Sequence, residues 1–451
     1  MDGGIFRPIF VPDEVREAVS GGAWLQAMLD AEAALATAEA QVGMIPHEAA
    51  AAIVSCCEAA RFDPGELGRD GRAAGNPIPP LVKALTADVS RVSEEAARYV
   101  HNGATSQDIV DTAAMLVTRR ALDLILAELE GISRACARLA EEHRGTIMAG
   151  RTLLQQALPT TFGLKSAGWL VSVLEVRRRL SDVRDRELAA QLGGAAGTLA
   201  SLGGSGVSVL REFARELGLA EPPVPWHTDR TRVAEIGGSL SLVAGVLGKI
   251  SQDVILMAQT EVGEVAEPAN GGRGGSSTLP HKQNPILSVI AVADTRRVRA
   301  HAQTLYGAMA GEHERAVGAW HAEWEALSDA LALTGGAATA VREATEGLEV
   351  HPEKLRRNLN ETGGMLMAEN VTTVVADRLG RLEAHELVGE AARRAADGRR
   401  PFRDELLAEP LLRERLSPEE IEAALDPAGY LGSAEAFIDR ALDLYREEAS
   451  S

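Results

Sequence analysis

The sequence is poor in aromatic residues, cysteines and long apolar runs, and each shortage excludes a class of protein. Aromatic residues make up 4% of the 451 positions while 45% are hydrophobic, so aliphatic residues and alanine must build the core, which favours helix over sheet. Three cysteines form no disulfide framework and suit a reducing cytosol. No run approaches the roughly 18 apolar residues of a membrane span, and no signal-peptide pattern opens the chain. We therefore expect a cytoplasmic protein with no membrane partner.

Positive charge is also in the minority. The chain carries 46 Lys and Arg against 65 Asp and Glu, which gives a formal net charge of -19. Such a balance disfavours binding to the phosphate backbone of nucleic acids, so we expect no nucleic-acid partner. A small anionic substrate stays compatible with this charge, provided that basic residues are concentrated in one place.

Prolines divide the sequence into three regions. They are frequent before residue 110 and after residue 351, whereas the segments 111–144, 160–220, 226–267 and 286–351 combine long proline-free stretches with helix-forming residues. The pattern predicts an all-α fold with an N-terminal helical domain (1–110), a central long-helix bundle (111–350) and a C-terminal helical domain (351–451). The segment 22–42 is the clearest N-terminal helix. No convincing alternating strand run is present, although this pattern leaves room for a short hairpin.

Helices of this length need to pack lengthwise against one another. Their apolar stripes are wider than the bundle of one chain would bury, so we expect association with other copies. A monomeric solenoid is the alternative, but no repeat at a fixed period is present.

The segment 271–285, GGRGGSSTLPHKQNP, is too rich in glycine and serine to bury apolar surface and is predicted to be a loop. Asn284 is a favourable N-cap and Pro285 suits the first position of the helix that follows. The loop would then bring Ser276, Ser277 and Lys282 to exposed backbone N–H groups, where an anion is favoured. A solvent-exposed linker is the alternative, although a linker has no need of the lysine or the Asn-Pro pair.

Two further segments are dense in hydrogen-bonding groups. HNGATSQD (101–108) precedes the first long helix, and there Thr105 and Asp108 stand at the spacing of a capping box. Its other polar residues, such as His101 and Gln107, are better explained as a pocket wall. The second segment, GRTLLQQALP (150–159), groups an arginine, a threonine and two glutamines.

Other chemistries find little support. Neither phosphate-binding glycine motif occurs, and no strand-borne serine nucleophile is present. A zinc site from His313, His321 and Glu325 lacks a recognised ligand spacing and any accompanying cysteine cluster. We therefore expect neither a metal nor an organic cofactor.

GGSSTLPHKQNP resembles the G-S-S-x-M-P-x-K-x-N signature of the fumarase/aspartase superfamily, with Leu279 where methionine is usual. The two other polar segments resemble that superfamily's remaining motif regions, in the same order and at similar separations. The resemblance implies a homotetramer whose central helices form a twenty-helix core. It also implies that each active site draws its three motif regions from three different subunits.

Within the superfamily, the chain resembles the cycloisomerase branch more than the lyase branches. Lyases usually carry histidine at the position of Leu153, and many carry glutamate at the position of Val289. The resemblance implies lactonisation of a carboxylated muconate, a small tricarboxylate, by addition of a carboxylate across a C=C bond with protonation of carbon. A fumarate-releasing lyase similar to adenylosuccinate lyase is the alternative, and a non-catalytic scaffold is a more distant one.

The resemblance also assigns roles to individual residues. Ser276 matches the catalytic serine, Ser277 supports it, and either Ser276 or Lys282 would donate the proton to carbon. The expected substrate-binding residues are His101, Ser106, Gln107, Arg151, Thr152, Gln155 and Asn284, with Arg315 and Arg297 as weaker candidates. Arginine is suited to bidentate pairing with carboxylates.

Overall fold

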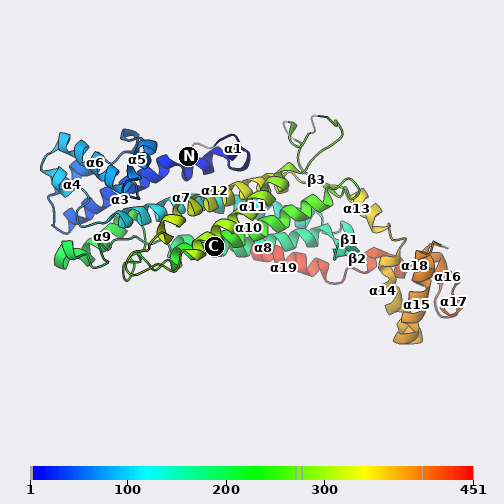
Figure 1. Cartoon of the computed structure of the whole chain (residues 1–451). Coiled ribbons are helices and arrows are strands. Elements are labelled where there is room, and N and C mark those ends of the chain that lie inside the picture. The colour runs from blue at the N-terminus through cyan, green and yellow to red at the C-terminus, as the bar shows by residue number, and fades with distance from the viewer. Residues whose placement is uncertain (1–3, 270–271, 276–277, 399, 450–451) are drawn as a thin grey trace. The chain divides into compact units, whose positions relative to one another are not determined.

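The computed structural model describes residues 4–269, 272–275, 278–398 and 400–449 (Figure 1). It is mostly helical, as the composition predicts. The chain forms two compact units: a first unit of residues 1–130, 175–249 and 289–341, and a second unit of residues 131–174, 250–288 and 342–451. Every boundary between them falls inside a long helix. The division into three domains stays a prediction.

Short helices make up the N-terminal part of the first unit. The predicted helix at 22–42 is confirmed as α3 (Gly21–Gln41), and its first turn is capped by the hydroxyl of Ser20, which accepts a hydrogen bond from the backbone N–H of Ala23. The others are α1 (Arg7–Phe10), α2 (Asp13–Ala18), α4 (His47–Val54), α5 (Pro64–Gly71), α6 (Ile78–Val92) and, from later in the chain, α9 (Gly206–Leu217).

Five long helices account for the proline-free segments: α7 (Ser106–Glu142), α8 (Phe162–Arg186), α10 (Thr231–Met257), α11 (Ile286–Gly307) and α12 (Ala319–Glu346). Within the first unit, glycines allow these helices to approach closely. A Cβ added to Gly237 of α10 would lie 2.8 Å from a side-chain carbon of Leu305 on α11. On α12, a Cβ added to Gly336 would lie 2.2 Å from the carbonyl oxygen of Phe10.

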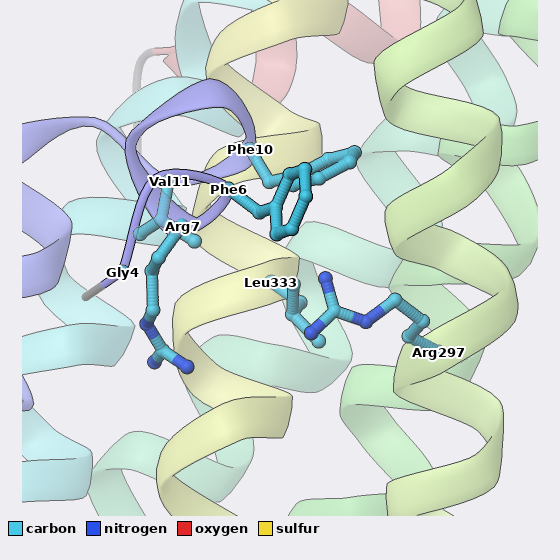
Figure 2. A pocket seen from close by; sticks show the side chains of 7 residues that line it. All are labelled: Gly4, Phe6, Arg7, Phe10, Val11, Arg297 and Leu333. Atoms are coloured by element: carbon cyan, nitrogen blue, oxygen red, sulfur yellow. The ribbon is translucent and has the colours of Figure 1, made fainter. Parts of the chain in front are cut away.

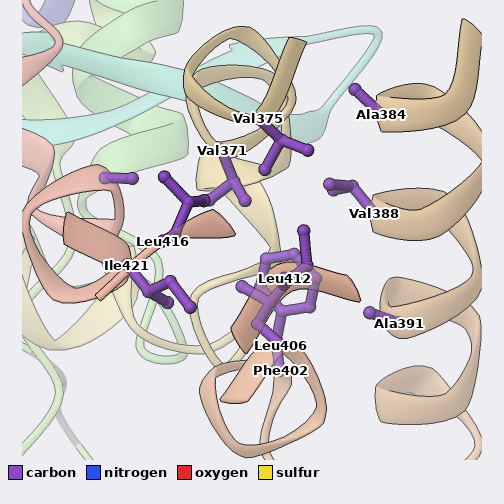
Figure 3. Packing of buried hydrophobic residues seen from close by; sticks show 11 residues of the cluster. Val371, Val375, Ala384, Val388, Ala391, Phe402, Leu406, Leu412, Leu416 and Ile421 are labelled. Carbon is purple, nitrogen blue, oxygen red and sulfur yellow. The ribbon is translucent and has the colours of Figure 1, made fainter. Parts of the chain in front are cut away.

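The C-terminal part of the second unit has its own apolar core. This C-terminal part consists of α13 (Pro352–Leu359), α14 (Ala368–Leu379), α15 (Arg381–Ala396), α16 (Phe402–Ala408), α17 (Pro410–Arg415), α18 (Pro418–Leu425) and α19 (Ala434–Ala449). Val371 and Val375 of α14, Val388 of α15, and Phe402 and Leu406 of α16 are buried together (Figure 3). Three of these helices begin with proline, which suits the first helical position because no N–H is needed there.

The sequence showed no convincing strand but left room for a short hairpin, and the structure has one hairpin and one further pair of two-residue strands. In the second unit, β1 (Ile147–Thr152) pairs antiparallel with β2 (Gln155–Thr161), and β3 (Val265–Ala266) pairs with β4 (Glu349–Val350). The hairpin escaped notice because its turn is Leu153-Leu154, without the glycine or asparagine that normally marks a two-residue turn.

Helix α10 is unusually apolar, with a mean hydropathy of 1.5 over its most apolar window. The helix is long and apolar enough to cross a membrane, but one such helix is weak evidence for a membrane span, since the core helix of a soluble protein can be equally long and apolar. Only 44% of that window is buried inside the chain. Among the other residues of α10, the side chain of Leu242 is 50% exposed within the chain.

We predict that Gly336→Ala destabilises the protein, because the new methyl group would overlap the Phe10 carbonyl, which is backbone and cannot rotate away. Overpacking of this kind costs about 1–3 kcal/mol. The measurements are the thermal unfolding midpoint and the rate of proteolysis of the N-terminal segment. Gly389→Ala in α15 is the matched control: no atom lies within 4 Å of its added Cβ, so stability should hold or rise slightly. Equal midpoints for the two variants would contradict the packing described.

Candidate functional site

The residues expected to form the site lie in both units. His101, Ser106, Gln107 and Arg315 belong to the first unit, whereas Arg151, Thr152, Gln155, Lys282 and Asn284 belong to the second. Each group is described by itself.

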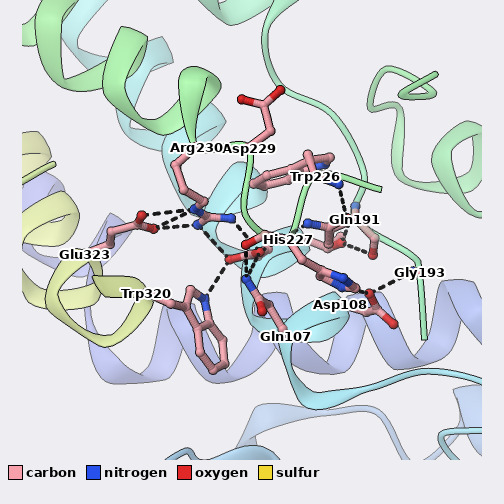
Figure 4. Close-up of polar contacts among 12 residues, drawn as sticks. Gln107, Asp108, Gln191, Gly193, Trp226, His227, Asp229, Arg230, Trp320 and Glu323 are labelled. Atoms are coloured by element: carbon pink, nitrogen blue, oxygen red, sulfur yellow. Dashed lines mark hydrogen bonds and ion pairs between the residues drawn. The ribbon is translucent and has the colours of Figure 1, made fainter. Parts of the chain in front are cut away.

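In the first unit, the start of α7 is fixed by one buried carboxylate (Figure 4). Asp108 is fully buried and accepts hydrogen bonds from the backbone N–H groups of Thr105, Gly193 and Gly194, each at 2.9 Å, while His227 Nε2 lies 2.7 Å away. The Thr105 bond is one half of the predicted capping box. The other contacts tie the polar segment 101–108 to loops about 85 and 119 residues further along the chain.

A second buried group lies one helical turn further along α7. This group is centred on Asp111 of α7, whose two oxygens accept hydrogen bonds from Arg230 at 2.8 and 3.0 Å and which also accepts one from Trp320 Nε1 (Figure 4). Arg230 donates to Glu323 as well, at 2.5–3.2 Å. Burial raises the pKa of Glu323, and Arg230 opposes that rise. Burial disfavours the charged guanidinium, but the two carboxylates outweigh it and raise the pKa of Arg230.

Gln107, an expected substrate-binding residue, takes part in this framework. Its side chain is fully buried, and Nε2 donates to Asp111 at 3.1 Å and to the carbonyl oxygen of His227 at 2.8 Å. Its Oε1 has no hydrogen-bond partner in the described part of the chain. Ser106, the first residue of α7, is half-buried.

His101 is held by a buried glutamate of α3. Its Nδ1 lies 2.7 Å from Glu32 Oε1, and its backbone is left-handed at φ 58°. Burial lowers the pKa of His101, but the hydrogen bond and charge of Glu32 outweigh burial, with a smaller contribution from Asp108, so the pKa is raised. Among the described residues no hydrogen bond reaches Nε2, which is therefore available to a ligand.

One heptad along α3, Glu39 repeats this arrangement. It accepts a hydrogen bond from Asn102 Nδ2 at 2.8 Å. Burial raises the pKa of Glu39 to about 7, although the Asn102 bond lowers it in part. Neither Glu32 nor Glu39 was predicted from the sequence as a site residue, because nothing distinguishes them from other glutamates in an alanine-rich helix.

Arg315 lies close to the same segment but is held differently. Its Nη1 donates to Thr105 Oγ1 at 3.1 Å and its Nη2 to the carbonyl oxygen of Ala195 at 3.0 Å. Within the described part of the chain no carboxylate pairs with it. Arg315 therefore brings positive charge to the segment 101–108 without an internal counter-ion.

In the second unit, Arg151 is already paired. It makes a bidentate ion pair with Glu264, at 2.9 and 2.6 Å, and Glu264 is fully buried and also accepts from Asn358 Nδ2. The guanidinium is thereby fixed in orientation, and its remaining N–H donors are the ones left for a substrate. Thr152 and Gln155 are exposed on either side of the hairpin turn.

The glycine-rich segment forms a loop, as predicted, in the part that the structure describes. Ser276 and Ser277 lie outside the described residues. Lys282 is exposed, and Asn284 donates from Nδ2 to the carbonyl oxygen of Gly274 at 2.9 Å, which draws the two ends of the loop together.

The predicted helix cap at Asn284 was wrong. Helix α11 begins at Ile286, and the first-turn N–H groups of Leu287 and Ser288 donate to the two carboxylate oxygens of Glu267 at 2.9 and 2.8 Å. A carboxylate stabilises a helix N-terminus just as a bound anion would. These donors are occupied by the chain itself, so they are not the anion site that the sequence suggested.

Arg297, the other weaker candidate beside Arg315, lines a cavity of about 330 Å³ with Arg7, Phe10 and Leu333 (Figure 2). Its guanidinium lies over the Phe10 ring at 5.6 Å. Arg7 pairs with Asp329 at 2.5 Å. Near Arg297 lies the buried Asp294, at 3.9 Å, whose pKa burial raises to about 7. Because each arginine has a carboxylate close by, this cavity lacks a cation held only by neutral oxygens, which Arg315 supplies to the segment 101–108.

Comparison with known proteins identifies the class. Residues 12–300 match the family model described as Lyase, and residues 364–441 match the one described as Adenylosuccinate lyase C-terminus. The chain belongs to this lyase family, the fumarase/aspartase superfamily that the three motifs indicated.

Individual relatives cover nearly the whole chain. A 3-carboxy-cis,cis-muconate cycloisomerase of Bradyrhizobium diazoefficiens is 46% identical over 97% of both chains. A nitrosuccinate lyase of Streptomyces davaonensis is also 46% identical, over 98% of this chain and 95% of the relative. Among solved structures, the 3-carboxy-cis,cis-muconate lactonizing enzyme of Pseudomonas putida matches with a TM-score of 0.94 and 44% identity over 99% of both chains.

We predict that Glu32→Gln lowers the pKa of His101, because the amide still accepts the Nδ1 hydrogen bond but no longer supplies the negative charge. Hydrogen–deuterium exchange at the histidine C2 position, followed by mass spectrometry of the peptide containing His101, measures that pKa directly. Glu39→Gln is the matched control on the same helix and should leave the pKa of His101 in place. An unchanged His101 titration in Glu32→Gln would show that Glu32 does not set its charge.

Proposed function

We propose that this chain is a cycloisomerase that lactonises 3-carboxy-cis,cis-muconate, a reaction of the protocatechuate branch of the β-ketoadipate pathway. The observation that carries the proposal is a pair of apolar residues. Leu153 lies at the tip of the β1–β2 hairpin and Val289 in the first turn of α11. Lyases of the superfamily usually carry histidine at the first of these positions, and many carry glutamate at the second. The relatives that bear this activity by name support the same reading.

The chemistry of lactonisation explains why a histidine–glutamate pair is not needed at these positions. The attacking group is a carboxylate of the substrate itself, which with a pKa near ~4 is ionised at neutral pH and requires no base. The reaction needs positive charge to hold three carboxylates, stabilisation of the enolate-like species and a proton for carbon. In contrast, elimination of an amine requires protonation of the leaving nitrogen, which leucine and valine do not provide.

The roles of the residues follow from this demand. Arg315 and His101 of the first unit, and Arg151 of the second, bind substrate carboxylates, helped by the polar groups of Ser106, Thr152, Gln155 and Asn284. Gln107 supports this segment from the buried side, because its amide group already donates to Asp111 and to the carbonyl oxygen of His227. Lys282 and the serines at 276 and 277 stabilise the enolate and supply the proton. Either Ser276 or Lys282 is the donor.

The assembled enzyme is a cytoplasmic homotetramer in this proposal. Helix α10 is apolar yet fewer than half of the residues in its most apolar stretch are fully buried within its own chain, and Leu242 is 50% exposed, which supports burial against other copies. Each active site then combines motif segments from different copies around a twenty-helix core. Three helical domains, 1–110, 111–350 and 351–451, describe one subunit.

A second candidate is elimination of nitrite from nitrosuccinate, because a relative with that name is as similar as the cycloisomerases. Nitrite leaves as a stable anion and needs no protonation, so the apolar residues at 153 and 289 are compatible with this reaction too. An adenylosuccinate lyase-like reaction is disfavoured by the same residues, since its leaving group is a nitrogen base.

We predict that the purified protein consumes 3-carboxy-cis,cis-muconate, seen as loss of the absorbance of the conjugated diene, and leaves adenylosuccinate unchanged. Parallel assays measure nitrite release from nitrosuccinate and fumarate formation from adenylosuccinate. Lys282→Ala should lose at least about 100-fold in kcat, because the loop cation stabilises charge that develops in the transition state.

The control for that variant is Lys83→Ala, at an exposed position of α6, which should retain parental turnover. Release of nitrite with no loss of diene absorbance would replace the cycloisomerase by the second candidate. Fumarate formed from adenylosuccinate alone would overturn both.

A further inference from the structure

The turn between β1 and β2 is built from residues that do not suit it. Thr152 pairs with Gln155, so the hairpin turns through only Leu153 and Leu154. Both have a left-handed backbone, with φ angles of 51° and 65°. A two-residue turn with two left-handed positions normally contains asparagine and glycine, because a Cβ at such an angle crowds the neighbouring carbonyl oxygen.

The side chains at this turn are also unfavourably placed. Leu153 is 97% exposed and Leu154 is 73% exposed within the chain. Burial of each side chain would contribute about 2 kcal/mol, yet within the chain both are exposed to water. A strained backbone that presents two apolar side chains points to a contact made with something outside the described subunit.

The neighbours of the turn indicate what that contact is. Thr152 and Gln155, on either side, are exposed polar residues, and the Arg151 guanidinium that precedes them is fixed by the buried Glu264. The hairpin tip therefore presents apolar groups between carboxylate-binding groups. The proposed substrate has the matching pattern, since its carboxylates flank an apolar conjugated carbon chain.

We infer that Leu153 and Leu154 form an apolar wall against the unsaturated carbon chain of the substrate and thereby determine specificity. This inference rests on the proposed function. The strained turn is retained because asparagine and glycine would relieve the backbone but remove the apolar contact. Water is also kept from the enolate-like species, whose stabilisation by charged donors is stronger where water is excluded.

The test is the double variant Leu153→Asn with Leu154→Gly, which keeps the turn and removes the apolar surface. We expect KM for 3-carboxy-cis,cis-muconate to rise at least about tenfold, since tenfold corresponds to 1.4 kcal/mol and two leucine contacts are lost. The thermal unfolding midpoint should equal or exceed that of the parent, because the turn becomes less strained. A gain in stability together with weaker substrate binding is not expected of a merely structural turn.

Two controls separate this effect from others. Leu382→Asn removes an equally exposed leucine, 85% exposed, from α15 and should leave KM unchanged. Propane-1,2,3-tricarboxylate, a saturated tricarboxylate without the conjugated chain, should inhibit parent and double variant with similar inhibition constants, because the carboxylate-binding groups are intact.

The outcomes are distinct. An unchanged KM in the double variant, with an active parent, overturns the inference and leaves the proposed function standing. Dissociation of the oligomer, seen by light scattering, also overturns it, because the leucines would then contact another copy. A parent that does not convert the substrate overturns the proposed function itself.

Discussion

Charges buried away from water must be paired, and this constraint fixes the candidate site. Asp108 satisfies its carboxylate with three backbone N–H groups and His227, and Arg230 lies between two carboxylates. Breaking such a group by removing one partner is strongly destabilising, since a buried charge is left alone. The polar segment at the start of α7 is therefore held in one conformation before any substrate arrives, which is what catalysis by fixed charges requires.

The same constraint distinguishes the cations of the motif segments. His101 and Arg151 each have a buried carboxylate behind them, Glu32 and Glu264, which orients the side chain and offsets its charge. Arg315 is held by neutral oxygens instead. We infer that the first two determine where a carboxylate is bound, while Arg315 and Lys282 supply most of the net attraction for a substrate with three negative charges.

Much of the fold could be predicted from local sequence, because helix formation depends on neighbouring residues. The segment 22–42 and the proline-free stretches gave helices, and the glycine-rich segment gave a loop. The three motif segments were also identified from local sequence, and the roles of their residues stay predictions. The β1–β2 hairpin could not be found in this way, because Leu153-Leu154 carries no turn signal and its conformation is imposed by strand pairing.

Partners distant in sequence were beyond local reasoning. Asp108 meets His227 across 119 positions, and Arg151 meets Glu264 across 113. Asn284 was predicted to cap the helix, but the carboxylate of Glu267, twenty residues before Leu287, accepts the hydrogen bond from the helix N-terminus instead. In each case the sequence contains suitable chemical groups at many positions, and only the folded chain determines which of them meet.

The central claim is that one active site combines motif segments from different copies of the chain. Arg315→Ala and Lys282→Ala, each inactive alone, would be co-assembled from a mixed, unfolded pool. If the two residues come from different copies, about one quarter of the sites in random tetramers contain both and activity returns to that fraction. If activity of the mixture stays at the sum of the two inactive variants, both residues come from the same copy and the account is contradicted.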